Sequence, residues 1–168
     1  KELGVFAEEN LINPVDGVKR PKAESEEGKT PALSDNDARA LLTAPKRETL
    51  QGKRDYAILS TLLYHALRRD ELCRLTLMDI QERRGVKHFR VHGKGSRIRY
   101  IPIHTATIEA ILDYLNSVTH SNDPEGALFR PFKNNRTGTL EKALSSDAIW
   151  RIVRKYALAA QIPLSARV

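Results

Sequence analysis

The sequence predicts a mixed fold that is mainly α-helical and contains one small three-stranded antiparallel β-sheet. Apolar residues recur at helical spacing in stretches near residues 38–42, 58–63, 108–115 and 149–160. Between the second and third of these stretches lie short runs of alternating polarity, separated by turns that contain glycine. The 168 residues, of which 40% are hydrophobic, suffice to bury one substantial core.

Five helices and three strands are expected from these patterns. The helices should cover about residues 34–44, 55–67, 69–75, 105–118 and 145–161. The strands should cover about 77–81, 86–91 and 97–103, joined by turns at 83–85 and 92–96. In the middle strand Val86, His88 and Arg90 are expected on one face, and Lys87, Phe89 and Val91 on the other.

The positive charge of the chain is concentrated in one place. The formal net charge is +7, and the segment from Glu82 to Tyr100 holds seven lysines and arginines against one glutamate. Such a segment is either a solvated sheet face or a basic ribbon that lies against phosphate groups. The density of charge favours the ribbon, and therefore a polyanionic partner.

Several classes of protein are disfavoured by composition. No apolar run approaches the roughly 20 residues of a membrane span, and the charged N-terminus is unlike a signal peptide, so a cytoplasmic protein is expected. The single cysteine, Cys73, cannot form an internal disulfide. The five histidines lack the spacing of a zinc site, which predicts no metal.

The most informative stretch runs from Leu62 to Leu75, where one apolar helix stops at Arg68 and a second helix begins at once. Glu71 follows three residues later. An isolated arginine here would be read as a solvated cation near a helix end. The run from Tyr64 to Leu75, however, resembles the first arginine motif of the tyrosine recombinases (phage integrases), Tyr-x-Gly-Leu-Arg-x-x-Glu-Leu-x-x-Leu, with Ala66 in the usual glycine position.

A second stretch supports the same resemblance. Residues 93–103 read Gly-Lys-Gly-Ser-Arg-Ile-Arg-Tyr-Ile-Pro-Ile, which is similar to the recombinase β-hairpin Gly-Lys-Gly-x-Lys-x-Arg-x-(Val/Ile)-Pro-(Leu/Ile). A Gly-Lys-Gly turn alone is a weak signal. It follows the arginine motif in the family's order, about 25 residues later, and the two motifs together are specific.

The resemblance implies site-specific DNA recombination or integration, in which a tyrosine attacks the scissile phosphate and forms a 3′-phosphotyrosine intermediate. It implies that Arg68 stabilises the negative charge that develops on the phosphate, because its planar guanidinium can donate two parallel hydrogen bonds to the phosphate oxygens. It assigns Lys94 as the general acid for the leaving 5′-oxygen. Glu71 would orient Arg68 or its neighbours. No cofactor is implied.

The implied partner is double-stranded DNA, bound by a homo-oligomer, a tetramer on paired sites, and no membrane is involved. Contacts to the DNA backbone, which set affinity and register but not sequence choice, are expected from five arginines: Arg69, Arg97, Arg99, Arg151 and Arg154. The last two lie on the polar side of the final helix, which is either a solvated face or a DNA contact.

The family pattern continues with His-x-x-Arg, a further His or Trp and the nucleophilic tyrosine, and none of these is matched in the 168 residues. We therefore expect residues 1–20 to end an N-terminal core-binding helical domain, 21–32 to be a linker, and 33–168 to be part of a catalytic domain. This chain alone is expected not to cleave DNA. The alternatives are a catalytically inactive DNA-binding module related to integrases and, more weakly, a basic scaffold for RNA or protein partners.

Overall fold

The computed structural model describes residues 33–162 except 94, 96, 134–137 and 139. The predictions for the domain end at 1–20 and the linker at 21–32 lie outside the described residues, as does the predicted general acid, Lys94. The boundaries of the three predicted domains therefore remain predictions. None of the helices in the described part of the chain combines the length and the apolar character needed to cross a membrane.

The described chain is mainly α-helical with one antiparallel sheet, as predicted. Its elements in chain order are α1 (Asp35–Thr43), α2 (Leu50–His65), α3 (Arg69–Arg74), η1 (Leu77–Asp79), β1 (Ile80–Arg83), β2 (Val86–His92), β3 (Ile98–Pro102), α4 (Thr105–Leu115), η3 (Thr119–Asn122) and α5 (Ser146–Ala159). The α labels mark α-helices and the η labels mark short 3₁₀ helices.

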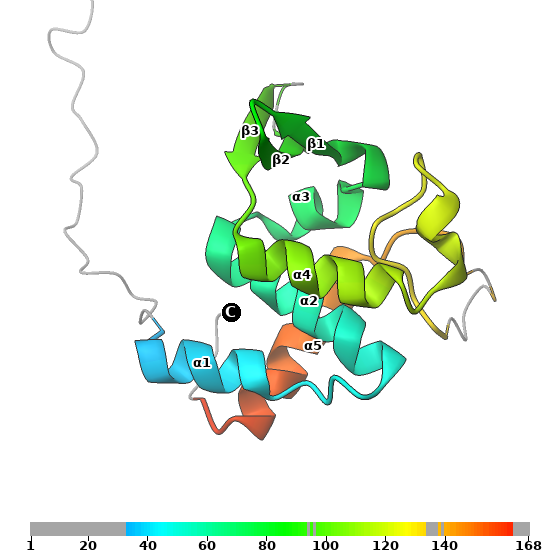
Figure 1. Ribbon diagram of the computed structural model, residues 1–168. Coiled ribbons are helices and arrows are strands. Elements are labelled where there is room, and N and C mark those ends of the chain that lie inside the picture. The colour runs from blue at the N-terminus through cyan, green and yellow to red at the C-terminus, as the bar shows by residue number, and fades with distance from the viewer. Residues whose placement is uncertain (1–32, 94, 96, 134–137, 139, 163–168) are drawn as a thin grey trace, which may run out of the picture. The chain divides into compact units, whose positions relative to one another are not determined.

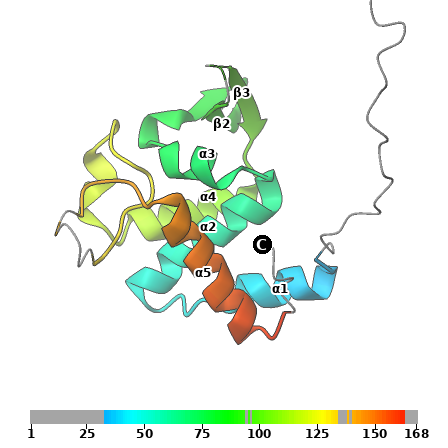
Figure 2. The same ribbon diagram turned by 180° about the vertical axis from the view of Figure 1, so that it is seen from behind.

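Helix α2 forms the middle of the helical part. Helix α4 packs along one side of α2, α5 packs on the other side, and α1 contacts α2 (Figures 1 and 2). Because α2 has neighbours on several sides, its residues Ala57, Ile58 and Leu59 are at most 1% exposed. The predicted apolar stripe of this helix is thus the centre of the core.

Helix α2 begins five residues earlier than the sequence suggested. The hydroxyl of Thr49 caps it by accepting a hydrogen bond from the amide of Gly52 at 3.0 Å. Gly52 is required because a Cβ at this position would lie 1.8 Å from the carbonyl oxygen of Lys46. The first turn carries polar residues, so apolar periodicity alone could not find it.

The sheet has the order β1-β2-β3 and is antiparallel throughout. Phe89 and Val91 of β2 are fully buried, whereas His88 and Arg90 on the other face are partly exposed, which confirms the predicted alternation. Helix α3 contacts β2 and also packs on α2 and α5. It therefore joins the sheet to the helical part (Figure 1).

The predicted first strand was wrong at its start. Residues 77–79 form η1, and the strand begins only at Ile80. The cause is Asp79, whose carboxylate accepts hydrogen bonds from both the amide and the hydroxyl of Thr76 at 2.9 Å. These local bonds favour a tight turn over an extended chain.

Candidate active site

The site begins with a left-handed residue at the end of α2. Ala66 has φ 49° and ψ 37°, and its amide donates to the carbonyl of Leu62 at 3.1 Å. This conformation ends the helix in the way that glycine usually does. The glycine of the family pattern is therefore replaced by an alanine that keeps the left-handed turn at a cost of about 1–2 kcal/mol.

The turn places Arg68 at the N-cap of α3. Leu67 is buried and anchors the turn, while Arg68 itself has extended backbone angles and a side chain that is 76% exposed. The junction of two helices at this residue is as predicted. The result is a guanidinium in solvent on a backbone that is fixed on both sides by helices.

The carboxylate of Glu71 lies beneath this arginine and is almost fully buried. Its Oε2 accepts a hydrogen bond from the backbone amide of Arg68 at 2.9 Å, which caps α3, and its Oε1 lies 3.3 Å from Nη1 of Arg68. Glu71 therefore holds both the backbone and, more loosely, the side chain of Arg68.

The stronger partner of Glu71 is Arg99 of β3. Its Nη1 donates to Oε1 at 2.8 Å and its Nη2 donates to Oε2 at 2.7 Å, which is the paired geometry of a strong charge-assisted contact. The contact to Arg68 is 0.5 Å longer than the first of these and single. Arg99 therefore balances most of the negative charge of the Glu71 carboxylate. The guanidinium of Arg68 keeps N–H donors with which it can bind an anion.

These contacts lower the pKa of Glu71 to about 2. The hydrogen bonds from Arg99 contribute most, the amide of Arg68 also lowers the pKa, and burial opposes both. Glu71 therefore stays ionised at any pH at which the protein would work, and it supplies a constant negative charge next to Arg68.

The β2–β3 turn leaves the sheet beside the same group. The amide of Gly93 donates to the carbonyl of Arg97 at 2.8 Å, and this bond closes the base of the turn. A Cβ on Gly93 would lie 3.4 Å from Nη1 of Arg99. The structure thus brings Arg68, Glu71 and Arg99 together and places the base of the turn next to Arg99.

The other predicted DNA-contacting arginines are exposed and have no described contact with Glu71. Arg69 begins α3, Arg97 precedes β3, and Arg151 and Arg154 lie on α5, where Arg154 stacks 5.1 Å from the centre of the Trp150 ring. Within the part of the chain that the structure describes, no hydrogen bond or ion pair joins any of these four to Glu71. Their contacts to DNA remain predictions.

Part of the basic segment is occupied by contacts within the protein. Nε of Arg90 donates to Oδ1 of buried Asp79 at 2.9 Å, and the guanidinium of Arg83 lies 3.8 Å from the centre of the Tyr100 ring. Together with Arg99, three of the seven cations of this segment thus have partners within the protein, which reduces the number of cations that the predicted ribbon offers to phosphate groups. The spacing of residues in the sequence could not show these pairings.

Comparisons with known proteins identify the family of this chain. The family model described as "Phage integrase family" matches residues 31–167. This chain belongs to the phage integrase family. The predicted membership of the tyrosine recombinase (phage integrase) family is thereby confirmed.

Curated members of the family match the chain at moderate identity. The tyrosine recombinase XerC of Pelobacter propionicus is 39% identical over 106 residues, which are 62% of this chain and 33% of that protein. The tyrosine recombinase XerD of Staphylococcus saprophyticus is 30% identical over 140 residues, which are 79% of this chain and 43% of that protein. The chain thus spans less than half the length of these relatives.

Solved recombinase structures share the fold. XerA aligns with a TM-score of 0.57 and 26% identity, covering 79% of this chain and 44% of XerA. XerH, bound to its difH substrate before cleavage, aligns with a TM-score of 0.63 and 17% identity, covering 82% of this chain and 39% of XerH. The predicted integrase catalytic core fold is confirmed.

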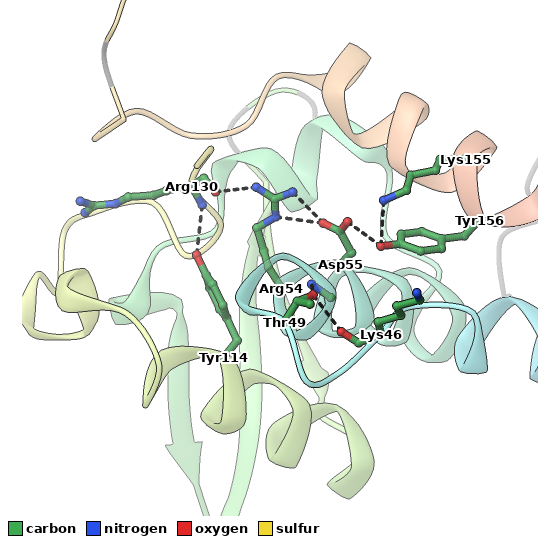
Figure 3. A network of polar contacts seen from close by, with 9 residues as sticks. Lys46, Thr49, Arg54, Asp55, Tyr114, Arg130, Lys155 and Tyr156 are labelled. Atoms are coloured by element: carbon green, nitrogen blue, oxygen red, sulfur yellow. Dashed lines mark hydrogen bonds and ion pairs between the residues drawn. The ribbon is translucent and has the colours of Figure 1, made fainter. Parts of the chain in front are cut away.

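A second polar group, which the sequence patterns did not indicate, lies in the core of this family member (Figure 3). Arg54 donates from Nε and Nη2 to Oδ1 of Asp55 at 3.0 and 2.7 Å, and Tyr156 of α5 donates to Oδ2 at 2.9 Å. Nη1 of Arg54 donates to the carbonyl of Arg130 at 3.0 Å. The signal that could have found it is Asp55 itself, which extends the stripe of Ile58 and Leu59 backwards by one helical turn.

This second group has a structural role. Arg54 and Asp55 are at most 5% exposed, and their contacts join the start of α2 to α5 and to the segment around Arg130. Burial and the nearby Asp55 raise the pKa of Tyr156 strongly, so its phenol stays protonated and donates. Among the described residues, no group of three or more His, Cys, Asp or Glu side chains could hold a metal ion.

Proposed function

We propose that this chain is part of a site-specific tyrosine recombinase that cleaves and rejoins double-stranded DNA through a 3′-phosphotyrosine intermediate. The observation that carries the proposal is Arg68: in a member of the phage integrase family, its exposed guanidinium lies at a fixed helix junction and rests on the buried carboxylate of Glu71. The structural neighbour XerH, a site-specific recombinase, is bound to its difH substrate in a pre-cleavage complex and, in a second structure, in a post-cleavage complex.

The chemistry fits the geometry. Attack on a phosphodiester places charge on the non-bridging oxygens, and an exposed guanidinium can donate two parallel hydrogen bonds to them. Glu71 fixes the backbone of Arg68 but holds its side chain by one long contact only. Arg68 is therefore oriented before DNA binds without being neutralised.

Lys94 remains the proposed general acid for the leaving 5′-oxygen, on the sequence match alone. The tyrosine nucleophile and the second arginine are expected from parts of the protein other than the 168 residues. We further propose that the full-length protein works in the cytoplasm and binds paired DNA sites as a tetramer. Arg69, Arg97, Arg151 and Arg154 are proposed contacts to the DNA backbone.

The decisive experiment measures covalent DNA adducts formed by the full-length protein on a nicked trapping substrate. The variant Arg68→Ala should lower the rate of adduct formation at saturating DNA by about 10²- to 10³-fold, because it removes preorganised donors to the developing charge. DNA affinity should change much less, since one phosphate contact is a small part of the whole.

The matched control is Arg74→Ala, which removes an exposed arginine from the other end of the same helix, where Nε donates to the carbonyl of Asp70. Its saturating rate should equal that of the unchanged protein. An unchanged rate in Arg68→Ala would contradict the assignment of Arg68. Tight DNA binding by the full-length protein without any adduct would favour the alternative, a catalytically inactive DNA-binding module.

A further inference from the structure

Arg99 occupies a position that is unusual for a contact to DNA. By register it lies opposite Val91, which is fully buried, so its side chain projects from the inner face of the sheet. From there its guanidinium binds both oxygens of Glu71, although the two residues are 28 positions apart in the chain. Two of its donors therefore point into the protein.

The same guanidinium also borders the base of the β2–β3 turn. The hypothetical Cβ of Gly93 would lie 3.4 Å from Nη1 of Arg99 and 3.4 Å from the carbonyl oxygen of Arg97. The guanidinium of Arg99 thus lies close both to Glu71 on α3 and to the backbone of Gly93. A Cβ at position 93 would be in ordinary van der Waals contact with it.

We propose that Arg99 is a positioning residue, whose paired hydrogen bonds to Glu71 fix β3 and the adjoining base of the β2–β3 turn relative to the helix junction that carries Arg68. This inference rests on the proposed function, since its purpose is to hold β3 and Glu71 in a fixed position beside Arg68, where the phosphate would bind. It differs from the sequence-based expectation, in which Arg99 contacts the DNA backbone.

The contacts favour positioning over a phosphate contact for a physical reason. If Arg99 turned towards DNA, the buried carboxylate of Glu71 would keep only the amide of Arg68 and one side-chain contact of 3.3 Å. A buried charge that loses its main partner is strongly disfavoured. The planar fork of Arg99 also matches the two carboxylate oxygens, which the single ammonium of a lysine cannot do.

The discriminating variant is therefore Arg99→Lys in the full-length protein, because it keeps the charge and removes the fork. If Arg99 serves as a positioning residue, DNA affinity and its salt dependence stay close to those of the unchanged protein. The rate of adduct formation at saturating DNA falls by up to about 100-fold, since small errors in placement are costly. Arg74→Lys, the same exchange at an exposed residue of α3 outside the basic segment, is the matched control and should change neither quantity.

A pH profile separates positioning from a loss of general stability. In Arg99→Lys the pKa of Glu71 should rise, because the largest cause of its low pKa is weakened while burial remains. The decrease in the rate of adduct formation at acidic pH, which accompanies protonation of Glu71, should then occur at a higher pH than in the unchanged protein. A variant that is merely less stable would keep this decrease at its original pH once the folded fraction is taken into account.

Hydrogen exchange in the absence of DNA tests the same inference without using activity. The amides of Arg68 and Gly93, which donate to Glu71 and to Arg97, should exchange faster in Arg99→Lys than in the unchanged protein and in Arg74→Lys. Full adduct formation in Arg99→Lys, with both amides still protected, would overturn the inference. If the unchanged protein forms no adduct, the proposed function fails, whereas the exchange of these two amides still decides the role of Arg99.

Discussion

Asp55 and Glu71 are both buried carboxylates that accept hydrogen bonds from an arginine, but their arginines differ in exposure. The side chain of Arg54 is 6% exposed, whereas the side chains of Arg68 and Arg99 are 76% and 42% exposed. At Asp55 both charged groups, the carboxylate and the guanidinium of Arg54, lie inside the core. The guanidinium donates its hydrogen bonds to groups within the protein. At Glu71 the negative charge is inside and the positive charges reach the surface.

This difference teaches how one kind of ion pair can serve two purposes. A fully buried pair contributes to a unique arrangement of elements, and here it joins α2 to α5 and to the segment around Arg130 (Figure 3). In the other kind of pair only the carboxylate is buried. Such a pair holds an exposed cation in place and leaves some of its N–H donors available for a ligand. Changing each carboxylate should therefore affect different properties of the protein.

The largest effect on stability is expected at Asp55. The variant Asp55→Asn removes the charge that balances buried Arg54 and weakens the acceptor of Tyr156, so it should lower the free energy of unfolding by about 3–5 kcal/mol. Chemical denaturation of the full-length protein measures this. Asp113→Asn is the control: its partners Lys53 and Arg47 are partly exposed, and the loss should be at most about 1 kcal/mol. Equal losses in the two variants would contradict the structural role of Asp55.

A smaller effect, which depends on pH, is expected at Glu71. The variant Glu71→Gln should lower the free energy of unfolding by about 2 kcal/mol at neutral pH, because it weakens charged hydrogen bonds to Arg68 and Arg99. The pKa of Glu71 is about 2 in the folded protein and 4.5 in its ordinary state. Because the unfolded chain takes up the proton first, the stabilisation by Glu71 is lost as the pH falls from about 4.5 towards 2.

The stability gap between the unchanged protein and Glu71→Gln should therefore narrow across that pH interval. Urea denaturation at a series of pH values between 7 and the acid limit of folding measures the gap. A gap that stays constant at every pH would show that Glu71 is not held ionised by Arg99. The stability losses in Glu71→Gln and Asp55→Asn would then differ in size alone.

The smallest change in stability is expected at the helix junction itself. Unlike the changes at Asp55 and Glu71, it should be stabilising. Ala66→Gly should raise the free energy of unfolding by about 1 kcal/mol, since glycine adopts φ 49° without the steric cost of a Cβ. Ala40→Gly, in the middle of α1, should lower it by about 1 kcal/mol. If both substitutions were destabilising, the left-handed conformation of Ala66 would be in doubt. Thermal denaturation of the two variants gives the answer.

Local patterns were sufficient for much of the fold. The stripe of Ile58 and Leu59, the alternation of Phe89 and Val91, and the helix junction at Arg68 each depend on neighbours a few residues away. Errors occurred where a polar side chain changed the local structure, as with Thr49 at the start of α2 and Asp79 before β1. A capping hydrogen bond leaves no periodic pattern, so these boundaries could not be read from apolar residues.

By itself, then, the sequence determined the class of fold, the family and the place of Arg68 at a helix junction. Only the tertiary structure decided which cation holds Glu71. Arg99 and Arg97 are two residues apart in the same basic segment, and no local property distinguishes them. The choice follows from the packing of the sheet on α3, which brings the inner face of β3 against the buried carboxylate, where a guanidinium is needed to balance its charge.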